Sequence, residues 1–261
     1  MKKNIVFIPA VKDPNRIGRS IGYEYSIKSW KHFCDKNDAE LFVLEDGLYD
    51  STFMSFAWQR YHLFKLLEEN DIDYDQVLMV DADTIVHPNC PNFFNETDYK
   101  YCGVQDSGCY EWVSRSLKKY HEEFFQDITV EPWIYFNGGF QIVNEKHKEF
   151  FNSVVDFYMS NSEKLLGIQK QFGLGTDQTP INYLVKKHNI DLKILPQCYN
   201  LNQLERKNLL YLSPQHCWWG DSLDNLYKSA WVYHFNGIPQ NPLQRGSDYF
   251  LERAYKELYD V

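Results

Sequence analysis

The first part of the chain alternates short apolar runs with longer segments whose apolar residues recur at helical spacing. The apolar runs at residues 4–10, 41–44 and 77–80 predict three strands. Between them, residues 22–36 and 58–69 predict two helices. The run at 77–80 is apolar throughout, as in a central strand covered on both faces. This order predicts an α/β fold with a mostly parallel central sheet and helices on both sides.

The rest of the chain is less regular. Its pattern predicts strands at residues 101–105, 140–143, 192–195 and 230–233, and helices at residues 146–159, 178–187 and 246–259. No repeat or linker separates these segments, so we expect a single domain over residues 1–261. Within it, we expect a nucleotide-binding half at about residues 1–105 and an acceptor-binding half at about residues 106–261.

Composition and charge narrow the possible partners. The 261 residues are 44% hydrophobic and 17% aromatic, which allows a sizeable core but does not separate core aromatics from sugar-stacking ones. The net charge of -9 repels phosphate backbones and anionic lipid, so we expect neither nucleic acid nor a membrane as partner. An anionic nucleotide would then need a local remedy, such as a bound cation.

The sequence also bears on the cellular compartment. No apolar stretch reaches the length of a membrane span, and the N-terminal apolar run is too short for a signal peptide. The six cysteines include no Cys-x-x-Cys pair, which favours free thiols in a reducing compartment, although Cys102 and Cys109 leave one pairing open. We therefore expect a cytoplasmic protein without membrane insertion.

Two carboxylates follow the apolar run at residues 77–80. In extended backbone, residues i and i+2 point to the same side, so Asp81 and Asp83 would converge beyond the carboxyl end of a parallel strand, where open α/β sheets bind ligands. Oxygen ligands there suit Mg²⁺ or Mn²⁺, which would hold a diphosphate. A solvated acidic turn is the alternative. The sequence has no Gly-x-Gly-x-x-Gly after its first strand and no Walker A motif, and this favours a metal bridge to the nucleotide.

Three further segments carry candidate chemistry, and each has a structural alternative. His234 follows a predicted strand and as a ligand would favour Mn²⁺ over Mg²⁺, although a lone histidine is more often structural. Gly138 and Gly139 would let the backbone approach a ligand closely, or would form an ordinary tight turn. Thr176 or Asp177 would reach a ligand, or would cap the helix that follows.

Together these segments resemble the GT-A fold glycosyltransferases, especially family 8, the glycogenin and lipopolysaccharide galactosyltransferase group. Those enzymes show a strand that ends in Asp-x-Asp, a Phe-Asn-x-Gly-x-Phe segment, an Asp-Gln pair that opens a helix, and a His-Phe-x-Gly segment near the C-terminus. The matching segments here are Val80-Asp81-Ala82-Asp83-Thr84, Phe136-Asn137-Gly138-Gly139-Phe140, Asp177-Gln178 with Asn182, and His234-Phe235-Asn236-Gly237. The resemblance covers most of the chain and implies a Rossmann-like GT-A fold.

The resemblance also implies a role for each matching position. It implies that Asp81, Asp83 and His234 bind Mn²⁺, with Mg²⁺ as the alternative, and that the metal bridges the donor diphosphate. The other donor contacts that it implies are Pro9, Ala10 and Val11 at the base, Arg60 at the phosphate or sugar, Asp106, Asn137 and Gly138 at the sugar, and Ala82 and Gly237. Asp177 and Gln178 would lie near the anomeric carbon as the catalytic pair.

These roles imply a metal-dependent glycosyltransferase. It would move a hexose from a nucleotide-sugar, by the resemblance a UDP-sugar, to a hydroxyl of a glycan or other acceptor with retention of configuration. In an inverting reaction, Asp177 would be the candidate base. Family 8 members often carry Lys-Pro-Trp after the histidine segment, whereas here residues 238–242 read Ile-Pro-Gln-Asn-Pro, with Arg245 as a candidate substitute. A neighbouring galactosyl- or mannosyltransferase family is therefore an alternative.

Two other functions fit parts of the sequence. A phosphatase of the haloacid dehalogenase type also uses Asp-x-Asp after a strand, but usually after the first strand of the chain. A non-catalytic carbohydrate-binding protein would use aromatic residues such as Trp218, Trp219 and Trp231. Such a protein would not need an acidic pair at the end of a parallel strand.

Overall fold

The structure is a computed structural model that describes residues 2–12, 20–106, 108–207, 209–210, 223–238 and 246–260. Its strands are β1 (Lys3–Pro9), β2 (Glu40–Leu44), β3 (Tyr74–Val80), β4 (Thr84–Val86), β5 (Tyr101–Gln105), β6 (Phe136–Asn144), β7 (Leu192–Leu195) and β8 (Val232–His234). Its α-helices are α1 (Tyr23–Asn37), α2 (Phe56–Gln59), α3 (Leu63–Glu69), α4 (Tyr110–Phe124), α5 (Lys148–Phe172), α6 (Gln178–Lys187) and α7 (Ser247–Tyr259). Short 3₁₀ turns include η2 (Arg60–His62), η3 (Phe93–Glu96), η4 (Pro132–Ile134), η5 (Glu145–His147), η6 (Gln197–Tyr199) and η8 (Leu223–Lys228).

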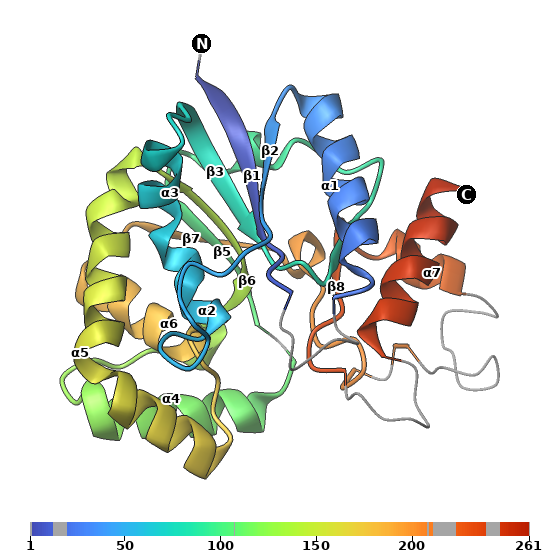
Figure 1. Cartoon of the computed structure of the whole chain (residues 1–261). Helices are drawn as coiled ribbons and strands as arrows, with labels where there is room; N and C mark the ends of the chain where they lie inside the picture. Colours follow the sequence, from blue (N-terminus) through green and yellow to red (C-terminus); the bar gives the residue numbers. More distant parts are fainter. Residues whose placement is uncertain are drawn as a thin grey trace.

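Six strands form one sheet in the order β2-β1-β3-β6-β5-β7 (Figure 1). β1 pairs in parallel with β2 and β3, and β5 pairs in parallel with β7. β6 runs antiparallel to both of its neighbours, β3 and β5. The predicted mostly parallel sheet is therefore confirmed, and the antiparallel strand in its middle is a feature that the sequence pattern did not predict.

Each central strand contributes side chains to two different cores, because successive side chains of a strand point to opposite faces of the sheet. Ile5 and Phe7 of β1 pack into a core that also contains buried residues of α3, α5 and α6. Val6 and Ile8 pack into a second core with Trp30 of α1. Figure 1 shows α3, α5 and α6 on one side of the sheet and α1 on the other. The prediction of helices on both sides is confirmed.

A small antiparallel sheet of β4 and β8 begins just past the end of β3. A third core joins Ile85 of β4 and Tyr233 of β8 to Phe250 and Leu251 of α7, and α7 also contacts α1. Because this core holds β8 against β4, the C-terminal part of the chain reaches the carboxyl end of β3.

Several elements differ from their predicted extents. The helix expected at residues 58–69 is interrupted, because η2 separates α2 from α3. The strand expected at residues 140–143 runs from residue 136 to 144 and is buried throughout. Gly138 and Gly139 lie within it, so their interpretation as a tight turn is wrong. Glycine weakens a strand pattern, but it is tolerated in a strand where another group approaches closely.

Other differences concern length. The helix expected at residues 146–159 is replaced by η5 and a longer α5 that ends at Phe172, where Gly173 takes the left-handed conformation (φ 61°) that commonly terminates helices. β4 has three residues and α4 has fifteen, and neither was predicted. Among the described residues, no helix is long and apolar enough to cross a membrane.

Asn182 attaches α6 to the start of β6. Its side-chain oxygen accepts a hydrogen bond from Phe136 N at 2.9 Å, and its side-chain nitrogen donates to Phe136 O at 2.9 Å and to Gln178 O at 2.8 Å. Both Phe136 groups are buried, and the bonds hold the first turn of α6 beside the sheet edge.

We expect Asn182→Ala to lower the free energy of unfolding by about 1–3 kcal/mol, because it leaves buried backbone groups of Phe136 unpaired. Urea denaturation followed by circular dichroism measures the change. Asn161→Ala is the matched control, because Asn161 bonds only within its own helix, to Phe157 O. An equal effect in both variants would contradict the proposed attachment.

Candidate active site

Two carboxylates and one imidazole meet just beyond the end of β3. His234 Nε2 lies 3.1 Å from Asp83 Oδ1 and 3.5 Å from Asp81 Oδ2. One ligand atom from each of the three residues falls within 4.8 Å of the others. Carboxylate oxygen and imidazole nitrogen together suit Mn²⁺, and the carboxylates alone suit Mg²⁺. The three residues could therefore hold a divalent metal ion.

The two aspartates converge by a route that differs from the expected one. Residues 82 and 83 form a turn rather than extended backbone, and Thr84 Oγ1 closes it by donating to Asp81 O at 2.7 Å. Phe235 N donates to Asp83 O at 2.9 Å, which ties this turn to the segment after β8. The turn and the β4–β8 pairing, rather than an extended i, i+2 pair, bring the carboxylates together.

His234 is buried, with 1% of its surface exposed, yet neither ring nitrogen has a hydrogen-bond partner among the described residues. A structural histidine in a core normally has such a partner. Burial alone would lower the pKa of His234, but Asp83 and Asp81 raise it from 6.5 to about 9. Nε2 faces the two carboxylates, at ion-pair distance, and this arrangement favours the ligand interpretation over the structural one.

Gly139 leaves the room that this cluster needs. It lies in β6 directly beside Asp81, whose backbone N donates to Gly139 O at 3.1 Å. A Cβ at residue 139 would lie 2.5 Å from Asp81 Oδ2 and 2.6 Å from His234 Cε1. Only glycine therefore allows β6, β3 and β8 to approach each other at this point.

Arg60 carries the positive charge of this region. It projects from η2, is 8% exposed, and its Nη1 lies 2.6 Å from Asp81 Oδ1 and 2.9 Å from Gly138 O. Its Nε lies 3.8 Å from Asp177 Oδ2. Burial disfavours the charged guanidinium, but Asp81 and then Asp177 raise the pKa of Arg60 above its ordinary value. Despite burial, Arg60 and then His234 hold the pKa of Asp81 below its ordinary value.

Asp177 stands at the N-cap of α6 but makes no capping hydrogen bond with its side chain. Its Oδ2 accepts from Tyr61 OH at 3.0 Å, and its Oδ1 accepts from Thr176 Oγ1 at 2.9 Å. The carboxylate is directed toward Arg60 instead of the helix end. The capping interpretation of Asp177 therefore has no support in the geometry.

Gln178 is the centre of a second hydrogen-bond network. Its Nε2 donates to Asp106 Oδ2 at 2.6 Å, and its Oε1 accepts from Asn137 Nδ2 at 2.9 Å and Gly138 N at 3.1 Å. Asn137 Oδ1 in turn accepts from Asn200 Nδ2 at 3.0 Å. Asp106, Asn137 and Gln178 thus meet at the same sheet edge as the acidic cluster.

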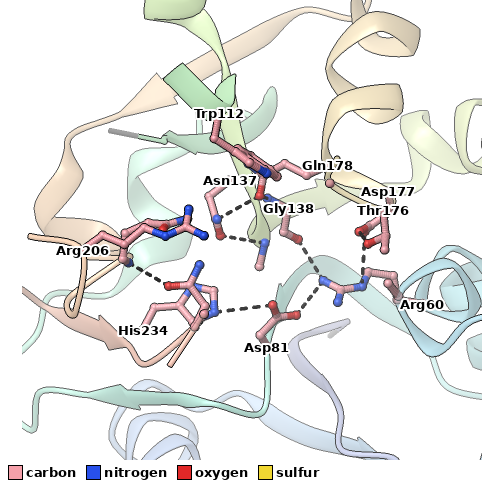
Figure 2. A pocket seen from close by; sticks show the side chains of 16 residues that line it. Arg60, Asp81, Trp112, Asn137, Gly138, Thr176, Asp177, Gln178, Arg206 and His234 are labelled. Carbon is pink, nitrogen blue, oxygen red and sulfur yellow. Dashed lines mark hydrogen bonds and ion pairs between the residues drawn. The ribbon is translucent and has the colours of Figure 1, made fainter. Parts of the chain in front are cut away.

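A cleft of about 310 Å³ is lined both by the acidic cluster with Arg60 and by the hydrogen-bond network around Gln178 (Figure 2). Its lining residues are Ala57, Arg60, Asp81, Trp112, Asn137, Gly138, Gly139, Gly175, Thr176, Asp177, Gln178, Gln203, Arg206, His234, Asn236 and Gly237. Its size falls at the lower end of the range for small-molecule sites. Of the predicted site residues, Arg60, Asp81, Asn137, Gly138, Asp177, Gln178, His234 and Gly237 line it.

Other predicted residues that the structure describes are not part of the cleft lining. Asp83 contacts His234, and Asp106 accepts a hydrogen bond from Gln178; His234 and Gln178 both line the cleft. Ala82, Pro9, Ala10 and Val11 are absent from the lining among the described residues. Ala82 and Ala10 are buried in the core on the α1 side of the sheet. Arg245, Trp218 and Trp219 lie outside the described residues.

Sequence reasoning missed four lining residues, Ala57, Trp112, Gln203 and Arg206, and it gave no role to Asn236 of the histidine segment. Trp112 lies on α4, whose Val113, Leu117 and Tyr120 recur at helical spacing, so the helix itself was detectable. Trp112 Nε1 donates to Gly173 O at 3.1 Å, and a Cβ at Gly175 would lie 2.7 Å from its ring. No sequence signal places the residues of the 203–206 segment at the cleft.

The fold is similar to that of two solved glycosyltransferases. One is a glycosyltransferase involved in the glycosylation of the major capsid of PBCV-1, with a TM-score of 0.58 and 12% identity over 99% of this chain and 100% of that one. The other is the WbbM bifunctional glycosyltransferase in its apo structure, with a TM-score of 0.56 and 13% identity over 99% of this chain and 51% of that one. This chain thus spans about half the length of WbbM.

At these identities the similarity establishes the fold alone. The sequence matches no protein-family model and no curated protein. The predicted fold, of the type found in glycosyltransferases, is confirmed, and membership of family 8 stays a prediction.

We expect Gly139→Ala to weaken Mn²⁺ binding by about 10–100-fold, because the added methyl group displaces Asp81 and His234. Isothermal titration calorimetry measures the affinity. Gly167→Ala is the control, because a Cβ there meets nothing within 4 Å. Unchanged Mn²⁺ affinity in Gly139→Ala would show that these two side chains do not form the metal site.

Proposed function

We propose that this protein is a metal-dependent glycosyltransferase that transfers a hexose from a nucleotide-sugar to an acceptor hydroxyl. The observation that carries the proposal is the Asp81, Asp83 and His234 cluster, which adjoins a polar cleft in a fold shared with glycosyltransferases. We take a UDP-sugar as the donor and a glycan or other hydroxyl compound as the acceptor, following the sequence resemblance.

Asp81, Asp83 and His234 would hold the metal, and their donor set fits Mn²⁺ better than Mg²⁺. When bound, the metal would neutralise the charge that builds on the departing nucleoside diphosphate. Arg60 keeps Asp81 ionised and oriented through its 2.6 Å contact. It is therefore a positioning residue for the metal ligands as well as a candidate donor contact.

The second network would bind the donor sugar. Asp106, Asn137 and Gln178 offer carboxylate and amide groups that suit sugar hydroxyls, and they hold one another in fixed orientations. Gly138 has no side chain to obstruct the sugar, and Gly237 lines the cleft beside His234. We assign Pro9, Ala10 and Val11 to the base and Ala82 to the donor side, on the resemblance alone.

Asp177 would face the anomeric carbon as a fixed negative charge, because Tyr61 and Thr176 hold its two oxygens. The acceptor O–H bond would break as its oxygen bonds to the anomeric carbon, and the bond from that carbon to the phosphate oxygen would break. The acceptor proton would pass to the departing phosphate. Because the departing phosphate takes this proton, the acceptor would approach from the face that the phosphate leaves, and the configuration would be retained.

The same observations bear on domain organisation and compartment. The cleft draws Arg60 and Asp81 from the first 105 residues, and Asp177 and His234 from the remainder, which supports one domain. The nucleotide-binding half at about residues 1–105 and the acceptor-binding half at about residues 106–261 would then share the donor site. Every described cysteine is a free thiol, Cys102 and Cys109 included, which supports a reducing compartment such as the cytoplasm.

The rival functions explain less of the geometry. A phosphatase would use Asp81 as a nucleophile, but its Oδ1 is bound to Arg60 and its Oδ2 faces His234. Trp231, which a carbohydrate-binding surface would expose, is only partly exposed, packing against the α1-side core and edge-on to His87.

A thermal-shift panel of nucleotide-sugars tests the proposal. One donor should raise the melting temperature with Mn²⁺ and much less without it, because binding to the folded state stabilises it. Asp83→Asn should keep its fold, as a nearly isosteric change, and should lose the Mn²⁺-dependent part of the shift. No shift with any nucleotide-sugar in the presence of Mn²⁺ or Mg²⁺ would refute the proposed function.

We expect metal binding to release one proton below pH 9, because the raised pKa of His234 keeps its imidazole protonated in the metal-free protein. The apparent Mn²⁺ affinity should then rise about ten-fold per pH unit from pH 7 toward pH 9. Conversely, the stability that this charged imidazole gives the metal-free fold is fully present below pH 6.5 and is lost as pH rises through about 9.

Calorimetry in two buffers of different ionisation enthalpy, between pH 6.5 and 8, measures the released proton. His234→Gln is the control, since it has no proton to release and should bind the metal more weakly. Proton-independent binding by the wild type would exclude His234 as a ligand.

We expect Asp177→Asn to lower donor hydrolysis by about 10²–10³-fold, because a fixed charge at the reacting centre is lost. The melting temperature measured on the same sample separates a role at the reacting centre from a capping role. Asp127→Asn is the control, an identical change at an exposed loop position. A lower melting temperature with near-normal hydrolysis would mean that Asp177 is structural.

A further inference from the structure

Two arginines line the cleft, and only one of them is already paired. Arg60 is buried against Asp81 and Asp177. Arg206 is exposed, and no carboxylate of the described residues lies within ion-pair distance of it. Figure 2 shows Arg206 and Arg60 on opposite sides of the cleft, with His234 and Asp81 along its lower edge. The free charge of Arg206 therefore lines the same cleft as Asp81 and His234 of the candidate metal cluster.

The backbone that carries Arg206 is fastened to the strand that carries His234. Leu201 N donates to Val232 O at 2.8 Å, and His234 N donates to Leu201 O at 3.0 Å. Two residues later, Gln203 N donates to Asn236 Oδ1 at 2.7 Å. The cluster and the Arg206 turn are thus parts of one hydrogen-bonded unit.

Gln203 shows that this turn is held in an unusual conformation. Its φ is 56°, a left-handed value that residues with side chains rarely adopt. It is 7% exposed, lines the cleft, and its Oε1 is buried without a partner among the described residues. Lys207 N donates to Gln203 O at 3.0 Å and closes the turn just after Arg206. Strained backbone and an unpartnered buried amide are typical of ligand-binding segments.

With a donor bound, the net charge of the cleft would favour a further cation. The carboxylates of Asp81, Asp83 and Asp177 share the site with the guanidinium of Arg60, and a divalent metal that displaces the proton of His234 brings this set only to neutrality. A nucleotide-sugar then adds the negative charge of its diphosphate, and the departing nucleoside diphosphate carries more. An acidic acceptor would increase the excess further. Because Arg206 lines the same cleft as the cluster that would hold the donor's metal, we take the donor diphosphate rather than an anionic acceptor as its partner.

We infer that Arg206 binds the donor diphosphate and stabilises the nucleoside diphosphate as it departs, so that it acts with the metal cluster as a catalytic residue. The inference rests on the proposed function. Arginine suits the task, because its planar guanidinium makes paired, charge-assisted hydrogen bonds to phosphate oxygens.

The test measures nucleotide binding with Mn²⁺ present. Calorimetry with UDP, GDP, ADP and CDP first identifies the base that the wild type prefers. Arg206→Ala should then weaken binding of that nucleoside diphosphate by about ten-fold or more, while binding of the uncharged nucleoside, followed by ligand-observed NMR, stays unchanged. Arg206→Lys should recover part of the loss. Arg253→Ala, which removes the same charge on α7, where Arg253 pairs with Glu257, is the control.

Three results would overturn the inference. Wild-type diphosphate affinity in Arg206→Ala excludes the contact, and equal losses for diphosphate and nucleoside would mean a structural defect. Unchanged diphosphate binding with turnover lost only for acidic saccharide acceptors would assign Arg206 to the acceptor. If the wild type itself binds none of the four nucleoside diphosphates, the proposed function is wrong. This result differs from failure of the Arg206 assignment alone, in which the wild type binds and the variant binds equally well.

Discussion

The antiparallel pairing of β6 with β3 is the constraint on which the site depends. This register sets Val80 opposite Phe140, so the start of β6 lies beside the carboxyl end of β3. Asn137, Gly138 and Gly139 therefore reach the same sheet edge as Asp81. With parallel pairing, the start of β6 would lie at the opposite edge of the sheet, and the two networks of the cleft would be separated by the length of a strand. Gly139 permits the close approach that this pairing demands.

Around that pairing, the structure concentrates charge in a place where water is partly excluded. Asp81 and Asp177 share the buried Arg60, and His234 faces Asp81 and Asp83. Burying such groups is unfavourable unless they compensate one another, and removing one partner leaves the others uncompensated. The cluster is thus better suited to receiving a cation and an anionic ligand than to stabilising the fold. Such a cluster is what we expect of a binding site, whereas the charges of a structural ion-pair network compensate one another.

Similarity of fold and chemistry of the site contribute separately to the functional argument. A shared fold at 12% and 13% identity does not by itself transfer an activity, because one fold hosts many functions. The residues at the sheet edge carry the argument for glycosyl transfer: a candidate metal cluster, an amide and carboxylate network suited to hydroxyls, and a free arginine. Arg206 shows how the tertiary structure can supply a charge at a position where no motif indicates one.

The sequence by itself determined the alternating α/β order and the parallel strands β1, β2 and β3, because apolar runs and helical spacing are local properties. It also pointed to Asp81, Asp177, Gln178 and His234 as candidate site residues, and all four line one cleft. Only the tertiary structure decided the antiparallel direction of β6, the small β4–β8 sheet, and the entry of Trp112, Gln203 and Arg206 into the cleft. These depend on contacts between segments far apart along the chain, and no pattern within a short window of sequence records such contacts.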